Sequence, residues 1–78
     1  EEEKRLQAEK RKKEKEVSRL EGEIAGVEAK ITELQNKLSD PAVYSVGEKA
    51  RAVQTEISDL QVQLEKLNEE WEQAALAL

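Results

Sequence analysis

The chain has 78 residues, 40% of them charged, and a net charge of -5, so it forms one small domain without room for a deep catalytic pocket. It contains no Cys and no His, which excludes disulfides, thiolate or imidazole zinc sites, and Ser-His or Cys-His catalysis. No apolar run is long enough for a signal peptide or a bilayer-spanning helix. We therefore expect a soluble, cytoplasmic protein with no membrane partner.

The first helix is expected to begin in a basic segment. Residues 4–19 carry eight Lys/Arg and three Glu, whereas residues 20–78 carry five Lys/Arg and twelve Asp/Glu. The run "KRKKEK" from Lys10 to Lys15 has the charge needed to bind phosphates, with an affinity that falls as salt rises. A second interpretation is a frayed helix end with solvated charges, and the pattern alone favours it because short basic runs are common on coiled coils.

Two runs of apolar residues, spaced alternately by three and four, lie on either side of a short break. Such a/d heptad spacing predicts coiled-coil helices. We expect helix 1 at about 1–39, a turn at 40–45 and helix 2 at about 46–78. The first run is Val17, Leu20, Ile24, Val27, Ile31, Leu34 and Leu38, and the second is Val46, Ala50, Val53, Ile57, Leu60, Leu64, Leu67, Trp71, Ala74 and Leu78.

The break contains Pro41, which cannot continue a helix and biases Asp40 toward extended geometry. Asp40 is expected to cap one short turn over residues 41–44. The "SVGE" sequence from Ser45 to Glu48 predicts a capping box at the start of helix 2. We expect Tyr44 to cover the tip of the hairpin.

A connection of about seven residues only allows the chain to turn back, so the expected fold is all-α, an antiparallel two-helix coiled-coil hairpin forming a single domain over 1–78. Two registers fit the heptads. In the preferred one Leu38 faces Val46, because Leu6 then closes against Leu78. In the alternative, shifted by one heptad, Leu38 faces Val53.

Trp71 of helix 2 and the two glycines of helix 1, Gly22 and Gly26, have two interpretations each. In the preferred register Lys13 faces Trp71, whose ring is expected to fill the base of the hairpin and not to stack on a ligand. Gly22 and Gly26 lie outside the seam, where each costs roughly 1 kcal/mol relative to Ala. They either allow a helix or a nucleic-acid backbone to approach, or they are losses that a packed hairpin tolerates, which is the favoured interpretation.

Carboxylates are numerous but lie on exposed helix faces, and no Gly-rich phosphate loop is present. No set of nucleophile, base and oxyanion donors can be assembled from the sequence. We therefore predict a domain that is not an enzyme and that holds no metal and no cofactor of its own.

The order of features resembles the C-terminal coiled-coil domain of ABC-F ATPases of the Uup type, over essentially the whole chain. The resemblance is carried by "LSDPAVYS" at the turn, with Asp40, Pro41 and Tyr44, and by the "EEWE" of Glu69–Glu72. It implies a domain that follows two ATP-binding cassettes, has no ATPase activity, leaves ATP to the other domains, and binds DNA or ribosomal RNA or faces the ribosome. The basic residues that the resemblance assigns to nucleic-acid contact are Lys10, Arg11, Lys12, Lys13, Lys15 and Arg19.

Two other functions compete with this one. The tRNA-binding coiled-coil arm of aminoacyl-tRNA synthetases such as the valyl enzyme is also a heptad hairpin, but it lacks the "DPxVY" turn and the late Trp. A structural spacer or dimerisation hairpin would bind only protein. We expect a monomer, with a dimer as the alternative, and the sequence does not distinguish DNA, ribosomal RNA and tRNA as the ligand.

Overall fold

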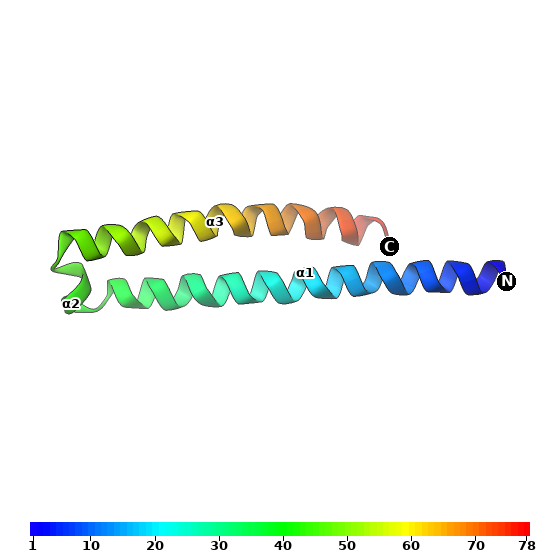
Figure 1. Ribbon diagram of the computed structural model, residues 1–78, viewed down its shortest axis with the longest axis horizontal. Helices are drawn as coiled ribbons and strands as arrows, with labels where there is room; N and C mark the ends of the chain where they lie inside the picture. The colour runs from blue at the N-terminus through cyan, green and yellow to red at the C-terminus, as the bar shows by residue number, and fades with distance from the viewer.

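The computed structural model describes all 78 residues as a helical hairpin (Figure 1). Its elements are α1 (Glu2–Leu38), α2 (Pro41–Tyr44) and α3 (Gly47–Leu76). Helices α1 and α3 run antiparallel side by side and give a rod with extents of 65 × 15 × 12 Å. The predicted all-α hairpin is therefore confirmed. No helix combines the length and apolar character needed to cross a bilayer.

The core is the seam between α1 and α3, and it follows the heptad spacing. Four seam residues are buried, namely Leu20, Ile31, Leu34 and Ile57. The remaining seam residues from Val17 to Leu38 and from Ala50 to Ala74 are half-buried, whereas almost all other side chains are exposed. Full burial of one such aliphatic side chain contributes about 1.5–3 kcal/mol. The rod is thus held together by a single line of apolar contacts.

The register differs from the preferred prediction. Leu64 packs against the buried cluster of Ile31, Leu34 and Ile57. With Leu38 facing Val46, Leu64 would instead face Leu20, which lies about 16 Å along α1 from Ile31. The register with Leu38 facing Val53 brings Leu64 within one turn of Ile31, so the heptad-shifted alternative is the one that forms.

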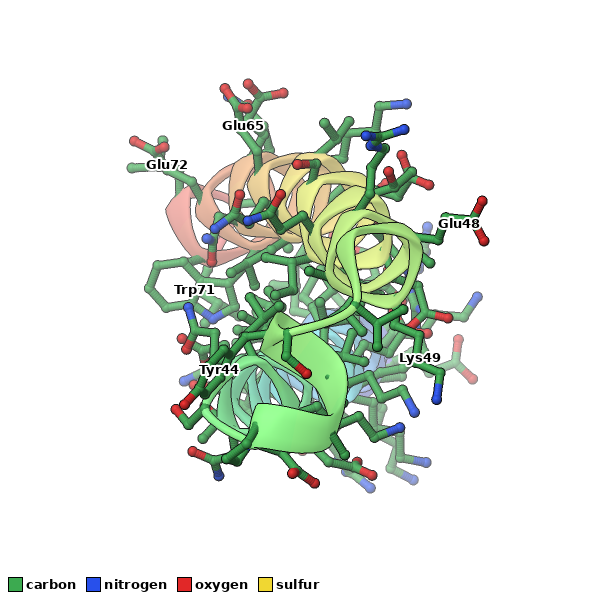
Figure 2. All side chains as sticks on the ribbon, turned by 90° about the vertical axis from the view of Figure 1, so that its left-hand side faces the viewer. Tyr44, Glu48, Lys49, Glu65, Trp71 and Glu72 are labelled. Atoms are coloured by element: carbon green, nitrogen blue, oxygen red, sulfur yellow. The ribbon has the colours of Figure 1, made fainter.

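The shift changes the open end of the hairpin, where α1 passes beyond the end of α3 (Figure 1). Leu6 is 65% exposed and Leu78 is 58% exposed, so the expected closure of one against the other is wrong. Lys13 and Leu78 line one shallow hollow, which Leu6 also lines without being buried against Leu78. Trp71 is therefore level with the buried Leu20 and not with Lys13, and its half-buried ring lies between the two helices (Figure 2).

The turn is built on Asp40, as predicted. Its carboxylate accepts a hydrogen bond of 2.9 Å from the amide of Ala42, and Pro41 occupies the first position of α2. The predicted capping box does not form, because the Ser45 hydroxyl donates to the carbonyl of Pro41. Helix α3 starts after Val46, which makes no side-chain cap.

The tip is covered by a different residue from the one predicted. Tyr44 is 58% exposed and Val46 is 41% exposed, whereas Val43 is half-buried. Within the short helix α2, Val43 is the one residue that is not exposed, so Tyr44 lies on its solvent-exposed side. The expected positions of Tyr44 as a cover and of Val46 as a seam residue are therefore wrong.

Candidate functional site

The six basic residues predicted to contact nucleic acid all lie on α1 and are all exposed, but they do not share one face. Heptad positions a and d form the seam, e and g flank it, and b, c and f point away from the partner helix. Lys10 and Lys13 occupy a and d positions on the side of α3. The other four predicted residues, Arg11, Lys12, Lys15 and Arg19, occupy b, c and f positions.

Between Lys4 and Ala29, the side of α1 that points away from α3 is cationic and free of carboxylates. We call the b, c and f positions from Lys4 to Ala29 the outer face of α1. All six glutamates between these two residues occupy e and g positions beside the seam. The outer face consists of Lys4, Arg5, Ala8, Arg11, Lys12, Lys15, Ser18, Arg19, Gly22, Ala25, Gly26 and Ala29.

Two members of this face, Lys4 and Arg5, were missed when basic residues were sought as a dense run along the sequence. The signal that identifies them is their heptad position, because Lys4 lies one heptad before Arg11 and Arg5 one heptad before Lys12. Both are exposed. The cations that share the outer face therefore begin at Lys4, and the seam-side Lys10 and Lys13 lie outside this face.

Arg19 differs from the other cations because two carboxylates hold it. Its Nε donates to Glu16 over 3.2 Å and its Nη1 donates to Glu23 over 3.0 Å. The hydrogen bond and charge of Glu16 raise the pKa of Arg19, and the same hydrogen bond lowers the pKa of Glu16. These side chains are about half exposed, so the pairs contribute little to stability. Their main consequence is that Arg19 is less free to bind an anion.

The remaining cations of the outer face, Lys4, Arg5, Arg11, Lys12 and Lys15, form no ion pair within the chain. The ion pairs of the structure are confined to Arg19 with Glu16 and Glu23, and to Lys30 with Glu33. An anion that meets these five side chains does not have to displace an internal carboxylate. They are the strongest candidates for contact with a polyanion.

The outer side of α3 carries the opposite charge. Its b, c and f positions hold five carboxylates and two cations; the carboxylates are Glu48, Asp59, Glu65, Glu69 and Glu72, and the cations are Arg51 and Lys66. Glu65 and Glu72 project from α3 away from α1 (Figure 2). The hairpin is therefore electrically two-sided, cationic along the first part of α1 and acidic along α3.

Gly22 and Gly26 lie on the outer face beyond the last cation. A Cβ atom added to either residue would meet no atom within 4 Å. Packing within the chain therefore does not require glycine at these positions, although each lowers the helix propensity of α1. From Gly22 to Ala29 the outer face consequently has only short, uncharged side chains.

The chain was compared with known proteins. The family described as "ABC transporter C-terminal domain" matches residues 5–75. This range includes most of α1, the whole of α2 and nearly all of α3. No curated protein and no solved structure matches the chain.

Proposed function

The chain belongs to the family of ABC transporter C-terminal domains and is an accessory domain of an ABC protein, and we propose that it binds nucleic acid, DNA or ribosomal RNA, in that role. It does so without catalysing a reaction, and ATP is bound by other domains of the parent protein. The "DPAVY" turn and the "EEWE" motif favour a parent of the ABC-F class, Uup type, acting in the cytoplasm or at the ribosome.

The observation that supports this proposal most strongly is the segregation of charge on α1. Five exposed cations without internal partners lie on a face that has no carboxylate. Lys and Arg side chains that neutralise phosphates release counterions from the nucleic acid, and this release drives binding of any sequence. The net charge of -5 does not exclude such contact, because five of the carboxylates lie on the outer side of α3, and Glu65 and Glu72 among them point away from α1 (Figure 2).

The binding is tested by titrating the full chain into labelled duplex DNA and structured RNA at several salt concentrations. We expect binding that weakens steeply with salt and is lost when Lys4, Arg11, Lys12 and Lys15 of the outer face are all changed to Glu. Helicity, followed by circular dichroism, should change little because all four residues are exposed. Absence of binding by the native chain to both ligands contradicts the proposal.

A matched control reverses the same number of charges elsewhere. The four substitutions are Lys30→Glu, Lys37→Glu, Lys49→Glu and Lys66→Glu, none of which lies on the outer face of α1. The two quadruple variants have equal net charge, so a difference in affinity between them measures the position of the charge. Equal losses in the two variants contradict the assignment of the site to the first part of α1.

A further inference from the structure

On the basis of the nucleic-acid binding proposed above, we propose that α1 lies lengthwise in the major groove of a B-form duplex, with its outer face toward the bases and α3 outside the groove. The proposal concerns the shape of the ligand, which charge alone does not specify. It follows from how the cations are arranged across the outer face, from the width of one helix, and from the absence of aromatic side chains on this face.

The cations of the outer face form two edges. Lys4 and Arg11 occupy b positions, and Arg5 and Lys12 occupy c positions, which point about 100° away around the helix. Between the edges lie the f positions, which are Ala8 and Lys15 within the cationic stretch and Gly22 and Ala29 beyond it, so Lys15 is the one long side chain among them. Cationic side chains that diverge from the two edges of a helix can contact the two phosphate backbones that border a groove, while the positions between the edges face the bases. A single backbone strand would be met better by cations in one central row.

The dimensions of the rod allow only one helix to enter such a groove, and the charge of the outer faces selects α1. One helix with side chains is about 10–12 Å across, and the major groove of B-DNA is about 12 Å wide. The Cα atoms of the hairpin alone extend over 15 × 12 Å across the rod, so both helices together do not fit. The minor groove of B-DNA, about 6 Å wide, and the deep, narrow major groove of A-form RNA exclude even one helix.

The length of the cationic stretch also fits the major groove of a B-form duplex. Lys4 and Arg19 are about 22 Å apart along α1 at 1.5 Å per residue, which is shorter than one turn of a B-form duplex, about 34 Å. A straight helix therefore stays in the groove over this distance before the groove curves away. The acidic outer side of α3 then points away from the phosphates, so the polarity of the hairpin orients it on the duplex.

Single strands are disfavoured as ligands because the outer face has no ring on which an unpaired base can stack. The two aromatic residues of the chain are elsewhere. Trp71 lies between α1 and α3, and Tyr44 lies at the tip of the hairpin (Figure 2). The contacts available on α1 are charged and suit paired strands.

The experiment compares a labelled B-form DNA duplex, an RNA duplex of the same sequence, and the single DNA strand, each titrated with the full chain at one salt concentration. We expect the DNA duplex to bind at least tenfold more tightly than the other two. We also expect protection of guanine N7, which lies in the major groove, from methylation by dimethyl sulfate. Equal binding of all three ligands, or no N7 protection, overturns groove docking and leaves the proposed function in place, whereas binding of none overturns both.

Two variants test the edges and the floor. Changing Lys4 and Arg5 together to Gln should reduce the slope of log affinity against log salt by about 2, because two phosphate contacts are lost. Changing Ala8 to Leu should weaken duplex binding about tenfold through a clash with the groove floor without altering charge, because the short, branched Leu side chain cannot bend aside to a phosphate as the long side chain of Lys15 can. The controls are Lys30→Gln with Lys37→Gln, and Thr55→Leu on the outer side of α3; effects equal to those of the test variants overturn the docking mode.

Discussion

The outer sides of α1 and α3 occupy equivalent positions in the same hairpin and carry opposite charge. Both consist of b, c and f residues that make no contact with the opposite helix, so packing places no demand on their identity. Between Lys4 and Ala29 the outer face of α1 has six cations and no carboxylate, whereas the outer side of α3 has an excess of carboxylates. The seam therefore specifies the fold, whereas packing leaves the outer residues free to serve the binding proposed above.

The largest expected effect is a loss of stability when a seam residue is changed. An exposed residue should show almost no such loss. Changing Leu34, which is 1% exposed, to Ala should lower the free energy of unfolding by about 2–5 kcal/mol. The matched change of Leu76, which is 76% exposed, should alter it by less than about 0.5 kcal/mol. Urea unfolding followed by circular dichroism measures both. Similar losses in the two variants would show that the seam described here is not the core.

The next largest effect is a change in affinity for duplex DNA when the charge of one outer side is reversed. Changing Arg11, Lys12 and Lys15 to Glu should weaken binding to duplex DNA by at least about 100-fold, since three phosphate contacts become repulsive. The converse change of Glu65, Glu69 and Glu72 to Lys should strengthen binding, because it supplies a second cationic surface on α3. Fluorescence anisotropy at one salt concentration measures both. Retained affinity in the first variant would remove the functional difference between the two helices.

The glycines of the outer face give a smaller effect, on stability. Changing both Gly22 and Gly26 to Ala should raise the free energy of unfolding by about 1–2 kcal/mol in total, because a Cβ at either position meets open space. Replacing both by Glu instead should weaken nucleic-acid binding if the ligand extends along the uncharged part of the face. Thermal unfolding and a binding titration of the two double variants separate these effects. No gain of stability with Ala would mean that α1 is not limited by its helix propensity there.

The smallest expected effect concerns the ion pair between Glu16 and Arg19. Because the hydrogen bond to Arg19 lowers the pKa of Glu16 in the folded chain, the pair stabilises the fold above the ordinary pKa of Glu and ceases to do so as the pH falls through the lowered value. The Glu16→Gln variant should therefore be slightly less stable than the native chain at pH 7 and equally stable in acid. Thermal unfolding at the two pH values tests this. A difference that persists in acid would point to a cause other than the charge of Glu16.

Much of the fold could be predicted from the sequence because the heptad spacing from Val17 to Leu38 and from Ala50 to Ala74 specifies the buried stripe directly. The register could not, since two registers one heptad apart satisfy the same spacing. The choice depends on the turn, where Val43 and not Val46 packs inward, and on the base, where Trp71 is level with Leu20. The capping box failed because α3 begins one residue later than predicted, with Val46 and not Ser45 at its N-cap, and the Ser45 hydroxyl donates to the carbonyl of Pro41.

The sequence predicts where along the chain the basic residues lie, but not how they are distributed around α1. A dense run of basic residues pointed to the first part of α1, but density along the sequence does not say which side of a helix a residue occupies. Lys10 and Lys13 belong to the seam side, and Arg19 is held by two carboxylates. Lys4 and Arg5 lie outside the dense run yet share the face. These distinctions required the seam to be located first.

The most direct test of the central claim, that the outer face of α1 is a phosphate-binding surface, is the salt dependence of binding of the full chain to duplex DNA. With five unpaired cations in contact with phosphates, the slope of log affinity against log salt should be about -4.5. The slope should shrink toward zero in the variant with Arg11, Lys12 and Lys15 changed to Glu. A slope near zero in the native chain, or one unchanged by these substitutions, would contradict the account.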